Sequence, residues 1–161
     1  MKTKNIQRVA LVGGGVIGSG WATRCLAHGL SVVVTDPSPA AVEMVLKTVD
    51  SAWPILEEAG IDEKADRRKL EFAPDIETAV ADADFVQENV PEREDLKIAV
   101  HEEIGRHAKG DIVVASSSSG LLPSRLQSRC RRPERLVIGH PFAPVYLLPL
   151  VEVVGGEQTS L

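Results

Sequence analysis

Three glycines near the start of the chain have the spacing of a phosphate-binding turn. Gly13, Gly15 and Gly18 form the pattern G-x-G-x-x-G between a short apolar run and a segment of helical periodicity. The first glycine would make the bend, the second would let a pyrophosphate approach, and the third would let the helix pack on the strand. The phosphates would lie at the helix N-terminus, against the free N–H groups near Val16 and Ile17. Glycines also cluster in ordinary turns, but the strand-to-helix context favours a dinucleotide site.

A carboxylate follows at the distance that this motif requires. Asp36 ends the apolar run 31–36, which predicts a second buried strand. A carboxylate there can accept hydrogen bonds from both hydroxyls of the adenine ribose and repels a 2′-phosphate, which favours NAD over NADP. The alternative is that Asp36 opens a turn with Pro37 and caps the next helix. After the glycine pattern, we favour the cofactor role.

Other polar residues follow further apolar runs. They are Glu88 and Glu92, the serines at 116–119, and His140. Ligands of open α/β sheets bind beyond the carboxyl ends of the strands, so these groups are expected to meet there. A histidine and hydroxyls beside NAD indicate hydride transfer from an alcohol, with His140 as general base. The serines could instead form a solvated turn and the histidine a simple strand end, whereas Glu152, inside an apolar strand, needs a partner if buried.

Predicted strands and helices alternate along the chain. This pattern predicts an α/β fold, a Rossmann-type doubly wound, mostly parallel sheet with helices on both faces. The strands are expected at 9–12, 31–36, 69–73, 84–90, 111–115, 135–140 and 148–154. The helices are expected at 19–28, 40–59, 61–68, 75–81 (capped by Asp75), 91–109 (with Pro91 in the first turn) and within 121–130.

The composition is that of one ordinary globular domain. The chain has 161 residues, of which 43% are hydrophobic and 25% charged, with a formal net charge of −5. An acidic balance gives no general attraction to nucleic acid or to an anionic membrane. Cys25 and Cys130 lack metal-type spacing, no metal site is expected, and Cys25 is expected in the core. The charged start at 1–5 precedes no signal-type apolar region and no segment could span a bilayer, so a cytoplasmic location is expected.

These motifs, in their order, resemble the 3-hydroxyacyl-CoA dehydrogenase superfamily over nearly the whole chain. The matching segments are 13–18, Asp36, 87–92 with Lys97, 115–120, 139–145 and 150–154. Within the superfamily, other segments are most similar to the branch that oxidises the 3-hydroxyl of L-carnitine to 3-dehydrocarnitine. The branch that oxidises L-gulonate, which includes lens crystallins, comes next. The segments that favour the first branch are Trp21, 52–54, 85–88, 91–96 and 145–152.

The resemblance implies roles for residues at the matching positions. His140 would take the hydroxyl proton while hydride passes to the nicotinamide of NAD. Glu152 would orient and charge that imidazole, and Ser119 would hydrogen-bond the substrate oxygen. Glu92 and Lys97 would contact the cofactor.

Three features depart from the pattern of the superfamily. Ala143 stands where an asparagine usually lies near the nicotinamide, and Ser118 replaces a threonine. The resemblance also implies an all-helical second domain, which closes the substrate site and forms a homodimer. That domain is absent from this sequence, so residues 1–161 are expected to be the NAD-binding domain alone and a poor catalyst by themselves.

The expected partner is a small molecule, carnitine or a related 3-hydroxy acid, with no nucleic acid and no membrane. The alternatives that stay open are a 3-hydroxyacyl-CoA or L-gulonate dehydrogenase domain, and a non-catalytic NAD-binding or structural module. Most of the substrate pocket is expected to lie in the second domain, so this sequence does not decide which 3-hydroxy acid is bound.

Overall fold

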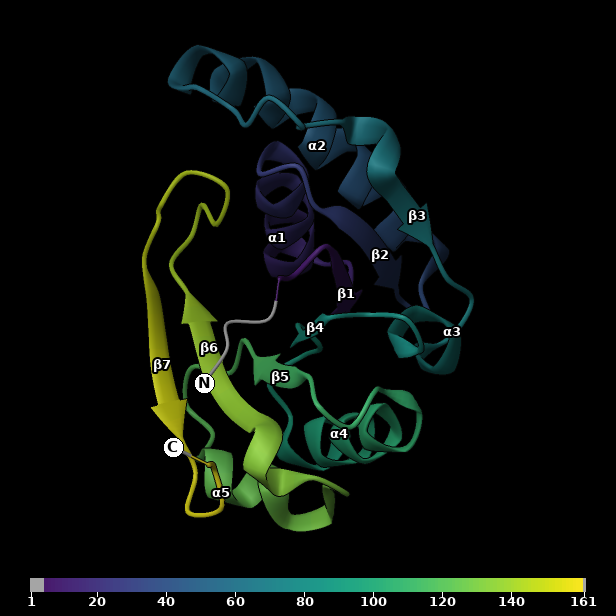
Figure 1. Ribbon diagram of the computed structural model, residues 1–161, viewed down its shortest axis with the longest axis vertical. Coiled ribbons are helices and arrows are strands. Elements are labelled where there is room, and N and C mark those ends of the chain that lie inside the picture. Colours follow the sequence, from purple (N-terminus) through teal and green to yellow (C-terminus); the bar gives the residue numbers. More distant parts are fainter. Residues whose placement is uncertain (1–4, 161) are drawn as a thin grey trace.

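The computed structural model describes residues 5–160, so the expectation for the first four residues lies outside the described part. Its centre is a seven-stranded sheet in the order β3-β2-β1-β4-β5-β6-β7 (Figure 1). The first six strands are mutually parallel and β7 is antiparallel to β6, which confirms the predicted mostly parallel sheet. The strands are β1 (Arg8–Val12), β2 (Ser31–Thr35), β3 (Leu70–Phe72), β4 (Phe85–Glu88), β5 (Val113–Ser116), β6 (Leu136–Pro141) and β7 (Val151–Gly155).

Helices cover both faces of the sheet. They are α1 (Val16–Ala27), α2 (Pro39–Ala59), α3 (Ile76–Val80), α4 (Glu94–His107) and α5 (Pro123–Leu126), with short 3-10 helices at Arg67–Lys69, Gln127–Arg129 and Pro133–Arg135. Successive side chains of a strand point to opposite faces. Val9 and Leu11 of β1 therefore pack with α1 and α2, whereas Ala10 and Val12 pack with α3 and α4. Burial of one such valine or leucine contributes about 1.5–3 kcal/mol.

The strand order creates a crevice between β1 and β4. From β1 the chain crosses over to β2 on one side, and from β4 it crosses to β5 on the other. Val12 and Glu88, the last residues of β1 and β4, are paired in the sheet, so the loops that follow them diverge. Ligands of doubly wound sheets bind at such a point.

One helix prediction is wrong because aspartates form local turns instead. Residues 61–66 are not helical, and only the 3-10 helix follows them. Asp62 Oδ1 accepts a hydrogen bond from Lys64 N at 2.8 Å, and Asp66 Oδ1 accepts one from Arg68 N at 2.9 Å. Such side-chain bonds to nearby backbone offer an alternative to the helical ladder.

The start of α4 also differs from its prediction. Arg93 N donates to Pro91 O at 2.7 Å, so a turn precedes the helix and Pro91 lies outside its first turn. The predicted cap of α3 is confirmed, since the carboxylate of Asp75 accepts a hydrogen bond from Thr78 N at 2.8 Å.

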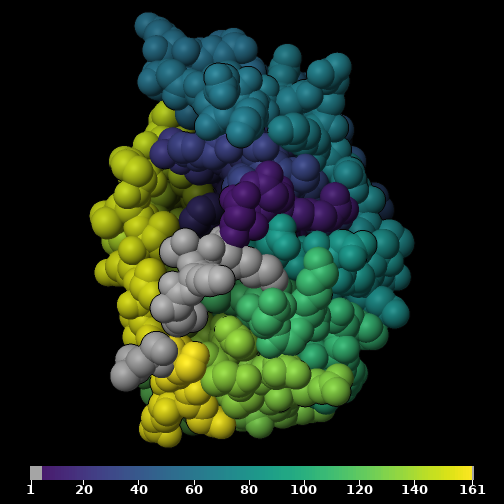
Figure 2. Space-filling view, viewed as in Figure 1, coloured from purple at the N-terminus to yellow at the C-terminus, as the bar shows by residue number. Residues whose placement is uncertain are grey.

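The last strand lies along one side of the molecule and is exposed throughout (Figure 2). Glu152 is therefore exposed, so the condition under which it would need a buried partner does not hold. Because β7 is the edge of the sheet, it pairs with β6 alone, and the side chain of Glu152 keeps 60% of its surface exposed. Within residues 5–160, no helix is long and apolar enough to cross a membrane.

Candidate functional site

A cleft of about 890 Å³ opens at the carboxyl ends of the parallel strands. Segments after β1, β2, β4, β5 and β6 meet there, as the polar residues at strand ends predicted. Most of the predicted site residues line the cleft, namely Gly13, Gly15, Val16, Ile17, Asp36, Glu92, Lys97, Ser119 and His140. Gly18 and Glu152 do not line it and lie behind residues that do. The fold therefore brings the site residues that were predicted from the sequence together in one cleft.

A side chain at each glycine of the turn would have a different steric consequence. Gly13 has a φ of +102°, and a Cβ on it would lie 2.8 Å from the backbone of Asn89. A Cβ on Gly18 would lie only 1.9 Å from Gly13 O, so the helix could not approach the turn. A Cβ on Gly15 would meet nothing within 4 Å and would project into open space. Gly15 thus keeps open a space that a ligand can fill.

The first turn of α1 faces this space with unpaired N–H groups. Gly15 is the N-cap residue, and no side chain caps the helix. Val16 and Ile17 line the cleft beside it. Unpaired N–H groups and the positive end of the helix dipole attract anions. The arrangement fits the pyrophosphate of a dinucleotide.

Asp36 is half-buried at the end of β2 and lines the same cleft. Its Oδ2 accepts a hydrogen bond from Gly14 N at 2.8 Å, and its Oδ1 accepts one from Ser38 N at 2.8 Å. Each carboxylate oxygen has a second lone pair, so both can still accept a ribose hydroxyl. Asp36 does hold the turn before α2, but Ser38, and not Asp36, is the N-cap residue of that helix.

Glu92 holds the serine turn in place. Its Oε1 accepts hydrogen bonds from Ser118 Oγ at 2.6 Å and from the N–H groups of Ser119 and Gly120 at 3.0 Å each. Burial raises the pKa of Glu92, but these hydrogen bonds and the charge of Lys97 outweigh it and hold the pKa below its usual value. The carboxylate of Glu92 therefore fixes the position of Ser119 at the cleft.

Lys97, which lines the cleft, forms a buried ion pair with Glu88. The two side chains are 1% and 0% exposed, and Lys97 Nζ lies 2.7 Å from Glu88 Oε1. Lys97 Nζ also donates to Val90 O at 3.0 Å and lies 3.5 Å from Glu92 Oε2. The protein therefore uses two of the three donors of this ammonium in hydrogen bonds. Ser116 Oγ donates to the other oxygen of Glu88.

His140 and Glu152 meet at the rim of the cleft. They are directly paired across β6 and β7, and His140 Nδ1 lies 3.0 Å from Glu152 Oε2. The proximity inferred from the sequence is thus present, although Glu152 is exposed. A carboxylate at Nδ1 favours the tautomer in which Nε2 is free to accept a proton.

A network of hydrogen bonds behind the histidine was not predicted from the sequence. Gln87 Nε2 donates to Gly139 O at 3.0 Å and to Ser117 Oγ at 2.8 Å, and Ser117 Oγ donates to Asn89 Oδ1 at 2.7 Å. These hydrogen bonds connect β4, β5 and β6 to Asn89, whose backbone faces Gly13. The signal for it was a glutamine within the apolar run of β4, where a buried amide needs partners.

The fold and the cleft define a dinucleotide-binding domain of a dehydrogenase. The family model described as "3-hydroxyacyl-CoA dehydrogenase, NAD binding domain" matches residues 8–161. The chain belongs to this family, and NAD is the cofactor of its domain, as the glycine turn and Asp36 predicted.

Among curated proteins, the chain is similar to L-carnitine dehydrogenases. It is 56% identical to that of Burkholderia mallei over 96% of this chain and 48% of the relative, and 51% identical to that of Bacillus cereus over 99% and 49%. A solved (S)-3-hydroxybutyryl-CoA dehydrogenase from Ralstonia eutropha is 31% identical, with a TM-score of 0.87 over 97% of this chain and 56% of the other. The chain spans about half the length of the curated relatives it matches.

Proposed function

We propose that this chain is the cofactor-binding part of an enzyme that oxidises the 3-hydroxyl of L-carnitine with NAD. The observation that carries the proposal is the His140–Glu152 pair, because His140 lines the same cleft as the glycine turn. Identities of 51–56% to L-carnitine dehydrogenases support carnitine over a hydroxyacyl-CoA or gulonate as the substrate. They also support a dehydrogenase over a non-catalytic module.

Each side chain of the cleft would have a separate role in the reaction. His140 Nε2 accepts the proton of the substrate hydroxyl, while Glu152 holds the ring through Nδ1 and stabilises the imidazolium that forms. Ser119, held by Glu92, donates a hydrogen bond to the substrate oxygen. NAD, when bound, accepts the hydride. The N-terminus of α1 would hold the pyrophosphate and Asp36 the adenine ribose.

The remaining wall of the substrate site would come from the part of the relatives that this chain does not match. A substrate with one wall missing is poorly positioned, and positioning supplies much of an enzymatic rate. We therefore expect residues 1–161 alone to bind NAD, to oxidise carnitine slowly and to be monomeric or weakly associated.

Calorimetric titration with NAD and NADP tests the cofactor part of the proposal. Because the carboxylate of Asp36 repels a 2′-phosphate, NAD should bind at least about tenfold more tightly, a difference of about 1.4 kcal/mol. Equal affinities would contradict the role of Asp36.

Formation of NADH with L-carnitine, with L-gulonate and with a 3-hydroxyacyl-CoA tests the substrate part. The assay uses the chain with its C-terminal end extended by the corresponding half of a carnitine dehydrogenase. His140→Gln should abolish turnover and leave the dissociation constant of NAD within about twofold. Higher kcat/KM with gulonate or a hydroxyacyl-CoA than with carnitine would overturn the choice of substrate.

A further inference from the structure

The strand that carries His140 extends beyond one of its two neighbours. Pairing between β5 and β6 ends at Ser116 and Ile138, after which the chain leaves β5 for the serine turn. Past that point, Gly139 and His140 pair only with β7, which is itself the exposed edge of the sheet. The end of β6 therefore needs another contact to keep His140 in a fixed place at the cleft.

The side chain of Gln87 supplies that contact from β4, two strands away. Its Nε2 donates to Gly139 O at 3.0 Å, although β5 lies between β4 and β6 in the sheet. A Cβ on Gly139 would lie 3.6 Å from Gln87 Oε1 and 3.1 Å from the Cβ of Ala115, so the amide packs directly against this backbone. The small residues at 115 and 139 thus leave the space in which the amide contacts β6.

The same amide is bonded to the serine turn and, through it, to the glycine turn. Gln87 Nε2 also donates to Ser117 Oγ at 2.8 Å, and Ser117 Oγ donates to Asn89 Oδ1 at 2.7 Å. The backbone of Asn89 lies against Gly13, where an added Cβ would be 2.8 Å from it. Both N–H groups of the amide therefore have acceptors, one on the strand of His140 and one at the cofactor cleft.

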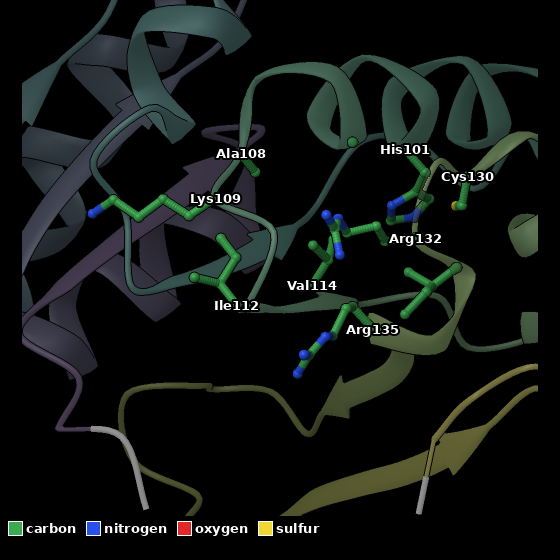
Figure 3. Close-up of a pocket in the computed structure, with 10 residues that line it drawn as sticks. His101, Ala108, Lys109, Ile112, Val114, Cys130, Arg132 and Arg135 are labelled. Atoms are coloured by element: carbon green, nitrogen blue, oxygen red, sulfur yellow. The ribbon is translucent and has the colours of Figure 1, made fainter.

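The amino ends of β5 and β6 are held less directly. A cavity of about 30 Å³ lies between them and α4, and Arg135 contributes to its lining (Figure 3). Arg135 Nε is buried without a hydrogen-bond partner within residues 5–160, and the cavity is large enough for a water molecule. At the carboxyl ends, by contrast, the protein itself supplies both acceptors of the Gln87 amide. Packing and direct hydrogen bonds of this kind hold a reacting group in one geometry.

We propose that Gln87 is a positioning residue for the reaction, which fixes His140 relative to the nicotinamide through the peptide carbonyl of Gly139. The inference rests on the proposed role of His140 as general base. Gln87 is 1% exposed and does not line the cleft, so it acts through the backbone and not by contact with NAD or substrate. Misplacement of a reacting group by about 1 Å can cost about a hundredfold in rate. Loss of the amide should therefore slow the chemical step.

The variant Gln87→Met separates the two attachments. Methionine has a similar length but no donor, so Gly139 O and Ser117 Oγ both lose the amide. The bond from Ser117 Oγ to Asn89 remains, as does the 3.0 Å bond from Asn89 Nδ2 to the backbone oxygen of residue 87. The glycine turn therefore keeps its support, and the dissociation constant of NAD should stay within about twofold.

The variant Gln127→Met is the matched control. Gln127 is likewise 1% exposed, and its Nε2 also donates to one carbonyl, Pro133 O at 2.8 Å, and to one hydroxyl, Thr159 Oγ1 at 3.0 Å. It does not line the cleft. Both variants should therefore lower the melting temperature by similar amounts, whereas only Gln87→Met should affect His140.

Two measurements follow the position of His140. In residues 1–161, ¹⁵N relaxation should give a lower order parameter for the backbone N–H of His140 in Gln87→Met and an unchanged one in Gln127→Met. In the chain extended by the C-terminal half of a carnitine dehydrogenase, Gln87→Met should lower kcat for L-carnitine at least about tenfold. The isotope effect with L-carnitine deuterated at C3 should increase, because hydride transfer then limits the rate. A merely structural glutamine would change the melting temperature alone.

The wild-type protein supplies a further test, which applies even if Gln87→Met does not fold. The side-chain N–H groups of Gln87 should exchange with deuterium far more slowly than those of exposed Gln158. Exchange as fast as at Gln158 would overturn the proposal, and so would equal kcat values and order parameters in the two methionine variants. If the wild-type extended chain does not oxidise carnitine, the proposed function fails, but relaxation and exchange still decide whether Gln87 holds His140.

Discussion

His140 and Glu152 face each other across the β6–β7 ladder, with Nδ1 and Oε2 separated by 3.0 Å. Side chains that are directly opposite in an antiparallel pair lie on the same face of the sheet. Because Glu152 is 60% exposed, solvent screens this contact, and pairs of this kind stabilise a fold by at most about 1 kcal/mol. The contact therefore matters for the orientation of the ring more than for folding.

Replacement of Glu152 by Ala should change the tautomer of His140 with little loss of stability. Without the carboxylate, the neutral ring should lose its preference for a proton on Nδ1, which ¹⁵N NMR of the imidazole measures directly. The free energy of unfolding should fall by less than about 1 kcal/mol. Glu157→Ala, at another exposed carboxylate, should leave the tautomer unchanged. An unaltered tautomer in Glu152→Ala would mean that the pair does not orient the ring.

Two alanine substitutions in the glycine turn should have opposite consequences. Gly18→Ala places a Cβ 1.9 Å from Gly13 O and should destabilise the fold by about 1–3 kcal/mol or more. Gly15→Ala meets no atom within 4 Å, so it should cost less than about 1 kcal/mol. It should nevertheless weaken NAD binding at least tenfold, because its methyl group enters the cleft. Urea unfolding and calorimetry separate the two effects, and normal NAD affinity in Gly15→Ala would place the pyrophosphate elsewhere.

Acid should destabilise the domain partly through Glu88. Burial raises the pKa of Glu88, but the hydrogen bond and charge of His101 and the ammonium of Lys97 outweigh it, so its pKa lies below the ordinary glutamate value of 4.5. The stability that this carboxylate contributes is therefore complete above pH 4.5 and is lost as the pH falls through the lower folded pKa. Urea unfolding at several pH values between 7 and 3 measures this loss.

The variant Glu88→Gln tests the same ion pair at neutral pH. It leaves Lys97 buried without its nearest counter-charge and should lower the free energy of unfolding by about 3 kcal/mol. Its stability should also depend less on pH between 5 and 3 than that of the wild type. Glu58→Gln, at an exposed position on α2, serves as the control. Equal stability of the two variants would show that the pair contributes nothing.

Both thiols should react slowly in the folded domain. Burial raises the pKa of Cys25 to about 12 and that of Cys130 to about 11, so neither thiol is ionised at pH 8. Thiolate is the reactive form. Mass spectrometry after treatment with iodoacetamide should therefore find little alkylation in buffer and two labelled thiols in denaturing urea. Cys130, which is partly exposed, should react before Cys25, and the reverse order would indicate that α1 opens locally.

The sheet could be predicted because its strands are short apolar runs bounded by turn residues. Runs such as 9–12 and 31–35 are too short to form helices. The segment 61–66 could not be assigned in the same way, because its charged residues suit a helix and the competing Asp62 turn becomes visible only in the folded backbone. Side-chain bonds of this kind depend on local geometry that composition does not fix.

The site was predictable to the extent that it lies at strand ends. The glycine turn, Asp36 and His140 follow apolar runs, and the parallel sheet brings those ends together. The exposure of Glu152 could not be predicted, because its apolar neighbours suit a buried strand and only the strand order shows that β7 is an edge. The partnership of Glu88 with Lys97 likewise needs the turn before α4, which the sequence did not predict.

The two backbone hydrogen bonds of Asp36 limit how this domain can be re-engineered. Its carboxylate fastens Gly14 of the phosphate turn and Ser38 of the α2 cap at the same time. A point substitution that makes room for a 2′-phosphate also releases both of those attachments, so gains in NADP affinity would come with a loosened cofactor turn. A switch of cofactor therefore calls for grafting the whole 36–38 loop from an NADP-dependent homologue, with its own replacement anchors for residues 14 and 38.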